Sequence, residues 1–225
     1  MTEAIAPGPA DASLLSRLNS AAESLGLDLS ASQAERLCRY LQALQRWNKV
    51  YNLTAVRDIE QMLTLHLIDC LAMIGPLRRH AEQFASLRLL DVGSGAGLPG
   101  VVIAALNPNI EVTCIDSVGK KAAFVQQVST ELSLVNLHSV HARVEHLSAP
   151  PFHVIASRAF ASLSDFVALS RGLLETDGQW LAMKGKTPAD ELAQLPPDID
   201  VFHVEPLIVP QLAAERCLVW MRITR

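Results

Sequence analysis

The chain has 225 residues, of which 50% are hydrophobic and 19% are charged. This composition excludes a disordered, collagen-like or low-complexity protein. A chain of this length buries about 70% of the surface of its unfolded state, so its core needs neither disulfides nor a metal. The formal net charge of −4 argues mildly against a polyanionic partner. That average conceals a basic segment, because residues 36–57 contain five basic residues and no acidic one.

The four cysteines lie far apart, and no two are closer than 32 positions. The chain therefore lacks the paired spacing of a zinc site, and we expect no metal. Its N-terminus lacks the basic and apolar segments of a secretory signal. The longest apolar run, Leu98–Leu106, is far shorter than the roughly 20 residues that span a bilayer. We expect a soluble, cytoplasmic protein that is a monomer.

The sequence pattern changes twice along the chain. Residues 1–12 are predicted to form a flexible tail, and residues 13–86 a helical region. Within that region, Gly26 is expected to end the first helix, and a capping-box pattern at Ser32 and Glu35 to open the second. A third helix is expected to begin after Asp58, just past the basic segment.

Residues 87–225 alternate between strand and helix patterns, which predicts an α/β domain whose sheet is mostly parallel and covered on both faces. The expected strands are 88–92, 111–116, 137–142, 152–157 and 179–184. The expected helices are 99–106, 118–133 and 162–174. Two further apolar runs, 201–209 and 216–223, fit a C-terminal antiparallel hairpin.

A glycine-rich turn between the first strand and its helix is the strongest chemical signal. Asp91 ends the strand, and Gly93, Gly95 and Gly97 follow at alternate positions. Glycines at such a turn let the backbone bend sharply and let a ligand approach closely. Asp116 ends the next strand, where a carboxylate typically accepts hydrogen bonds from the ribose hydroxyls of a nucleoside cofactor.

This turn matches the dinucleotide fingerprint by letter, but that match alone is weak. The leading Asp91 fits a cofactor without phosphate better than one with a pyrophosphate. The pattern resembles the first motif of S-adenosylmethionine-dependent methyltransferases, with their Rossmann-like sheet. A nicotinamide enzyme and a turn without any ligand are the alternatives.

Blocks on both sides of the glycine turn narrow the resemblance. They are Trp47–Val56, His66 with Asp69, Ser157–Ser162, and Lys184 with Gly185. In order and spacing these blocks resemble the bacterial family of 16S ribosomal RNA guanine-N7 methyltransferases, also called the glucose-inhibited division protein B family. The resemblance covers about residues 30–222. Cys70 is a small departure, because the family more often has serine there.

The resemblance implies a site that binds S-adenosylmethionine. The residues that it assigns to the cofactor are Gly93, Leu98, Val144, Glu145 and Arg158. On the physical grounds given above we add Asp91, Gly95, Gly97 and Asp116. Val144 and Glu145 are expected beside the adenine. The implied reaction is methylation of N7 of a specific guanine in the decoding-region loop of 16S ribosomal RNA.

Guanine N7 carries a free in-plane lone pair, so it needs no general base before it attacks a methyl group. The protein must instead align the reacting atoms and exclude water. Arg158 is the predicted catalytic residue, and Phe160 is expected either to stack on the base or to pack in the core. His66 and Asp69 are expected to pair and to brace the helical region against the glycine turn.

Basic residues are expected to contact RNA phosphates, while a flipped guanine supplies the specificity. The candidates are Arg36, Arg39, Arg46, Lys49, Lys120, Lys121 and Lys184, with Arg57, Arg78 and Arg79 beside them. The expected partner is the small ribosomal subunit or an assembly intermediate of it. A small-molecule methyltransferase and a non-catalytic ribosome-assembly module remain as alternatives.

Overall fold

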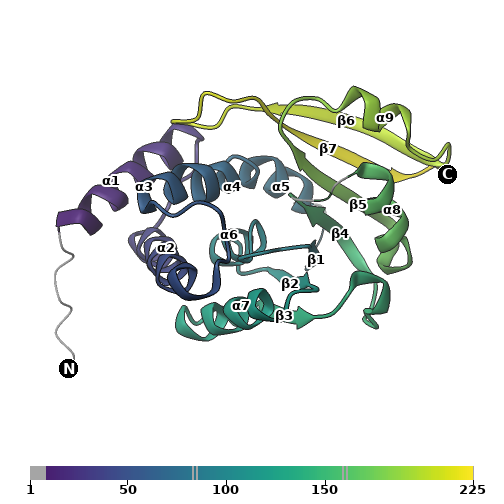
Figure 1. The fold of residues 1–225 in the computed structure, drawn as a ribbon. Helices are drawn as coiled ribbons and strands as arrows, with labels where there is room; N and C mark the ends of the chain where they lie inside the picture. The colour runs from purple at the N-terminus through teal and green to yellow at the C-terminus, as the bar shows by residue number, and fades with distance from the viewer. Residues whose placement is uncertain (1–8, 83, 85, 159, 161, 225) are drawn as a thin grey trace.

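The computed structural model describes residues 9–82, 84, 86–158, 160 and 162–224. Its centre is a sheet of seven strands in the order β3-β2-β1-β4-β5-β7-β6 (Figure 1). The strands are β1 (Leu87–Val92), β2 (Ile110–Asp116), β3 (Leu137–His141), β4 (Phe152–Ser157), β5 (Leu174–Lys184), β6 (Ile199–Leu207) and β7 (Arg216–Ile223). This arrangement confirms the predicted α/β class.

The first five strands are parallel to one another, and the last two pair with each other in an antiparallel arrangement. β1 pairs in parallel with β2 and β4, β2 with β3, and β4 with β5. β7 runs antiparallel to both β5 and β6, so the predicted C-terminal hairpin is confirmed. The chain moves outward from β1 to β3 and then returns to place β4 on the other side of β1. Parallel sheets bind ligands where the strand order reverses in this way, beyond the carboxyl ends of the strands.

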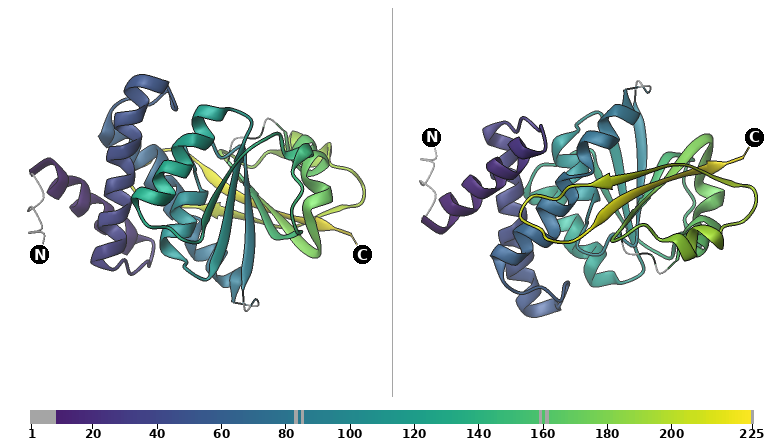
Figure 2. Two further views of the ribbon diagram at one scale, coloured as in Figure 1. Left: turned by 90° about the horizontal axis from the view of Figure 1, so that it is seen from below. Right: turned by 90° about the horizontal axis from the view of Figure 1, so that it is seen from above.

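Alternate side chains of the strands enter two different cores, as the twofold period of a strand requires. Leu89 faces a core shared with the N-terminal helices, whereas its neighbour Leu90 faces a core under α8. The α-helices that follow β1, β2, β4 and β5 are α6 (Gly100–Leu106), α7 (Gly119–Glu131), α8 (Leu163–Ser170) and α9 (Ala189–Ala193). Short 3-10 helices follow β3, as η2 (Val144–His146), and α8, as η3 (Arg171–Leu173). Figure 2 shows α2 and α7 on one side of the sheet and α8 on the other.

Helices also fill the chain before β1. They are α1 (Pro9–Ser24), α2 (Ala31–Tyr51), α3 (Ile59–Met62), the π-helical turn η1 (Leu63–Ile68), α4 (Asp69–Leu71) and α5 (Ile74–Ala81). Their buried residues, such as Leu41 on α2 and Leu67 on η1, belong to the same hydrophobic core as α6 and one face of the sheet. The helical region therefore packs directly against the part of the sheet that carries the glycine turn.

The structure corrects two expectations for the N-terminal region. Helix α1 begins at Pro9, so residues 9–12 are helical, and the rest of the expected tail lies outside the described residues. The capping box of α2 uses Ser30 and Gln33, not Ser32 and Glu35. The Ser30 hydroxyl accepts from the Gln33 N–H at 3.2 Å, and Gln33 Oε1 accepts from the Ser30 N–H at 3.0 Å. The helix therefore begins with a capping box, as expected, but two residues earlier in the chain.

In the described part of the chain, no helix is long and apolar enough to cross a membrane.

Candidate active site

The glycine turn leaves β1 at Val92 and enters α6 at Gly100. Gly93, Gly95 and Gly97 have φ values of +67°, +60° and +84°, a left-handed backbone that favours glycine. A Cβ atom on Gly97 would lie 2.6 Å from Val101 Cγ2, so this position also requires glycine for packing. The N–H groups of Gly93 and Ser94 both donate to the Ile115 carbonyl, which ties the turn to the end of β2.

Asp91 lies fully buried beneath this turn. Its Oδ2 accepts a hydrogen bond of 2.8 Å from the Gly100 N–H, while its Oδ1 is buried without a hydrogen-bond partner among the described residues. Burial raises the pKa of Asp91 to about 7. A buried carboxylate oxygen without a partner suits a positively charged group, so this residue fits the amino group of S-adenosylmethionine.

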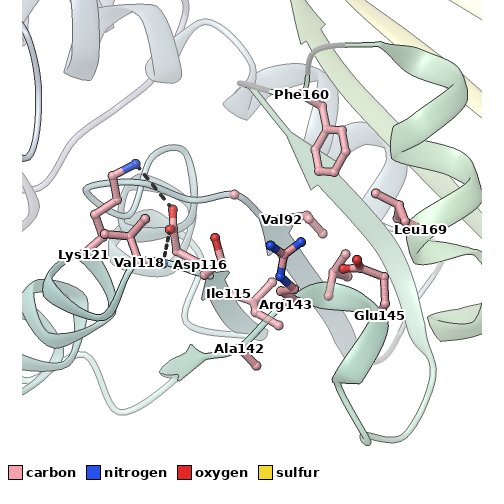
Figure 3. A pocket seen from close by; sticks show the side chains of 13 residues that line it. Val92, Ile115, Asp116, Val118, Lys121, Ala142, Arg143, Glu145, Phe160 and Leu169 are labelled. Atoms are coloured by element: carbon pink, nitrogen blue, oxygen red, sulfur yellow. Dashed lines mark hydrogen bonds and ion pairs between the residues drawn. The ribbon is translucent and has the colours of Figure 1, made fainter.

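A cavity of about 360 Å³ opens beside the turn, between the carboxyl ends of β1 and β2 and the segment after β3 (Figure 3). Asp116 forms one wall, where its Oδ2 accepts from the Gly95 N–H at 2.9 Å and its Oδ1 from the Val118 N–H at 2.8 Å. The Lys121 ammonium lies 3.8 Å from Asp116 Oδ2. Each carboxylate oxygen has a second lone pair, so Asp116 can still accept bonds from ribose hydroxyls.

Four of the predicted cofactor residues line this cavity: Gly93, Asp116, Val144 and Glu145. Asp91, Gly95, Gly97 and Leu98 are not among the residues that line it, although they belong to the turn beside it. The structure adds lining residues that the sequence did not single out for the cofactor, namely Arg143, Phe160, Leu169 and Lys121. Arg143 directly precedes Val144 and Glu145, and this adjacency was the available signal.

Arg158 is not among the lining residues of this cavity. It follows Ser157 at the end of β4, and its Nη1 donates to the Leu65 carbonyl at 3.1 Å and to Asp69 Oδ2 at 3.2 Å. The helical region therefore holds the predicted catalytic arginine. Its neighbours Ala159 and Ala161 lie outside the described residues, whereas the Phe160 ring packs against Phe166 at 5.4 Å.

The expected pairing of His66 with Asp69 is wrong. His66 Nε2 lies 2.9 Å from the Thr54 hydroxyl, and Asp69 is instead bonded to Arg158 and Arg216. The reason is the π-helical turn η1, whose wider hydrogen-bonding pattern means that residues three positions apart no longer share a face. Burial lowers the pKa of His66, and the nearby charge of Arg158 lowers it further.

The basic residues divide into paired and unpaired ones. Arg39 Nη2 donates to the Glu131 carbonyl at 2.9 Å, and Arg46 Nη2 lies 3.0 Å from the Glu131 carboxylate. Lys184 forms an ion pair of 2.7 Å with Glu191, and its side chain is only 15% exposed. Within the described chain, no ion pair is found for Arg36, Lys49 or Lys120. Together with Lys121, which pairs with Asp116, four of the seven predicted RNA contacts are therefore already engaged inside the molecule.

Two solved structures share this fold at low sequence identity. One is TrmN from Thermus thermophilus, with a TM-score of 0.55 and 20% identity over 72% of this chain and 53% of that chain. The other is a SAM-dependent methyltransferase from Aquifex aeolicus, with a TM-score of 0.53 and 16% identity over 68% of this chain and 92% of that chain. The chain is therefore an α/β protein with a Rossmann-like fold, which it shares with a SAM-dependent methyltransferase.

Sequence comparison specifies the family. The model of the GidB family, described as rRNA small subunit methyltransferase G, matches residues 33–219. The chain is also 58% identical to the ribosomal RNA small subunit methyltransferase G of Acidovorax sp. (strain JS42), over 91% of this chain and 93% of that protein. The chain therefore belongs to the rRNA small subunit methyltransferase G family. The resemblance noted in the sequence is confirmed.

Proposed function

We propose that this protein transfers the methyl group of S-adenosylmethionine to N7 of one guanine in the decoding-region loop of 16S ribosomal RNA. The observation that carries the proposal is the unpartnered, buried Asp91 oxygen beneath a left-handed glycine turn, in a chain of this family. We infer that the protein acts in the cytoplasm as a monomer, on the small subunit or its assembly intermediate.

The proposed cofactor contacts follow from the positions of the side chains. Asp91 is assigned to the amino group, and Asp116, at the wall of the cavity, to the ribose hydroxyls. Val144 and Glu145 are assigned to the adenine, and the Gly93, Gly95 and Gly97 turn gives the cofactor access to the backbone. When bound, S-adenosylmethionine supplies an electrophilic methyl group on its sulfonium.

The protein's contribution to the reaction is alignment, because guanine N7 needs no deprotonation. The Arg158 Nη1 donates to two acceptors of the helical region, the Leu65 carbonyl and the Asp69 carboxylate, and this fixed position suits a residue that orients the reacting groups. Phe160 lines the cavity and can cover a bound nucleoside. Neither assignment requires a proton to move.

We assign the phosphate contacts to the exposed residues Lys49 and Lys120 and to the half-buried Arg36. Lys121 is reassigned to the cofactor cavity because it lies beside Asp116. Arg39 and Arg46 are reassigned to seating α2 on the last turn of α7, and Lys184 to its ion pair with Glu191. For Arg39, Arg46 and Lys184, the reassignment predicts that a neutral substitution changes stability more than RNA affinity.

The direct test incubates the protein with labelled S-adenosylmethionine and either protein-free 16S RNA or small subunits that lack the modification. The RNA is then cleaved with borohydride and aniline, which maps N7-methylguanine. We expect one new cleavage site that depends on the protein, and a much weaker one with the Asp91→Asn variant when the cofactor is limiting. Cofactor binding without any new cleavage site in either RNA would contradict the proposal.

A further inference from the structure

Asp69 binds two arginines that come from the ends of two strands, β4 and β7, which are separated in the sheet by β5 alone. Its Oδ1 accepts from Arg216 Nε at 2.7 Å, and its Oδ2 accepts from Arg158 Nη1 at 3.2 Å. The Asp69 side chain is only 4% exposed, whereas each arginine side chain is 22% exposed. One buried carboxylate from the helical region therefore fixes a guanidinium at the end of β4 and another at the start of β7.

This cluster carries an excess of positive charge. Two guanidinium groups share one carboxylate, and no second ion pair of either arginine is found in the described chain. The carboxyl of Asp91 is close enough for the charge of Arg158 to act on its pKa, but it makes no contact with Arg216 in the described part of the chain. Cys70 lies close enough to affect Arg158, but burial raises the pKa of its thiol to about 12, so the thiol stays neutral. A largely buried cation without its own counter-ion is costly, and an anionic ligand relieves that cost.

A buried ring nitrogen without a hydrogen-bond partner lies close by. His66 Nε2 lies 2.9 Å from the Thr54 hydroxyl, which also accepts from the Val56 N–H. His66 Nδ1 is buried without a hydrogen-bond partner among the described residues. His66 is 8% exposed and lies on the same π-helical turn whose Leu65 carbonyl holds Arg158. A buried polar atom without a partner therefore lies next to the segment that holds Arg158.

The strand order places Arg216 away from the cofactor turn. Cys217 is paired with Lys184, so Arg216 lies at the same edge of the sheet where β5 ends. β4 and β5 separate β7 from β1, and three strand spacings amount to about 14 Å. Most residues that line the cofactor cavity lie on the other side of β1, at the ends of β2 and β3, and the remaining ones include Phe160 and Leu169 but neither Arg158 nor Arg216. An anion at Arg216 is therefore better supplied by the RNA than by the carboxylate of the cofactor.

We propose that Arg216 binds a backbone phosphate of the substrate RNA close to the target guanine, and that Asp69 is the positioning residue that holds Arg216 beside Arg158. This inference rests on the proposed RNA methyltransferase function and adds a contact to it. The guanidinium of Arg216 has a planar fork of donors that suits a phosphate. Its Nη1 donates a hydrogen bond of 2.8 Å to the Glu215 carbonyl, which fixes the orientation of the group.

The test compares Arg216→Gln with Arg222→Gln. Arg222 is a matched control, since it is on the same strand and is paired with the single carboxylate of Asp200. Binding to small subunits is measured by filter retention over a series of salt concentrations, and binding of S-adenosylmethionine by calorimetry. For Arg216→Gln we expect RNA affinity to fall about tenfold and the slope of log K against log salt to decrease by about one. Cofactor affinity should stay within twofold, and Arg222→Gln should match the wild type.

Unchanged RNA affinity of Arg216→Gln, or a loss confined to cofactor affinity, would overturn the inference. If Arg216→Gln does not fold, Arg216→Lys provides the test because it keeps the charge. It should retain the salt slope and lose affinity severalfold through the missing fork, and full affinity would contradict the proposal. Methylation by the wild type in the same buffer distinguishes a failure of the proposed function from a failure of the Arg216 contact. If the wild type forms no N7-methylguanine, the proposed function is wrong. If it methylates normally and Arg216→Gln binds RNA as well as the wild type, only the Arg216 contact is wrong.

Discussion

Charged residues lie both at the end of β1 and on the outer face of α2, but the two regions differ in whether these residues have hydrogen-bond or ion-pair partners. At β1, Asp91 is fully buried and one of its oxygens has no partner among the described residues. On α2, Arg39 and Arg46 are exposed and both contact Glu131. A buried polar group that remains unsatisfied is costly and indicates a ligand, whereas an exposed group that is already paired indicates a structural role.

The strongest test of this contrast removes the charge of Asp91 without changing its shape. Asp91→Asn can still accept the Gly100 hydrogen bond, but it no longer offers an anion to the cofactor's amino group. A charge-assisted hydrogen bond in a buried site is worth about 1.5–3 kcal/mol, so we expect cofactor affinity to fall about 10- to 100-fold. Calorimetric titration measures the effect. Asp190→Asn, on the exposed face of α9, is the control and should bind normally.

A second test addresses the backbone of the turn rather than its charge. Gly97→Ala requires a side chain at φ +84° and brings its Cβ within 2.6 Å of Val101. We expect the free energy of unfolding to fall by about 1–3 kcal/mol, as measured by urea denaturation. Gly172 has open space and no positive φ, so Gly172→Ala should be close to neutral. Equal losses for the two variants would show that the turn has no special constraint.

A third test uses pH. The pKa of Asp91 is raised to about 7 by burial, so below pH 7 the carboxylate must release a proton before it can pair with an amino group. Cofactor affinity should therefore fall as the pH drops below 7, approaching tenfold per unit, and Asp91→Asn should remove this dependence. In the ligand-free protein the sign is opposite: the raised pKa adds stability at low pH, and that stability is lost as the pH rises towards 7. An affinity independent of pH would contradict this role.

The smallest effects are expected on α2. Arg46→Gln breaks an exposed ion pair, which is worth at most about 1 kcal/mol, and RNA affinity should change less than threefold. The matched variant is Lys49→Gln on the same helix, which should decrease the salt slope of RNA binding by about one. If Arg46→Gln weakened RNA binding as much as Lys49→Gln, the division between paired and unpaired basic residues would be wrong.

The same contrast explains which features were predictable from the sequence. The glycine turn and its strand and helix depend on residues within about one βα turn, and the expected strand 216–223 matches β7 at both ends. By contrast, the partner of Arg46 lies 85 positions away and that of Arg158 lies 89 positions away. The sequence also carries no signal for the π-helical turn, and this turn decides where His66 and Asp69 point. Long-range partners, rather than local propensity, determine which charges remain available.

One contact joins the two regions. The hydroxyl of Tyr40, fully buried on α2, donates a hydrogen bond of 2.8 Å to the Ala96 carbonyl within the glycine turn. Any displacement of α2 by docked RNA therefore perturbs the turn, and any ligand that stiffens the turn also restrains α2. Coupling of this kind is reciprocal, so any factor by which one substrate alters the affinity of the other applies equally in the reverse direction.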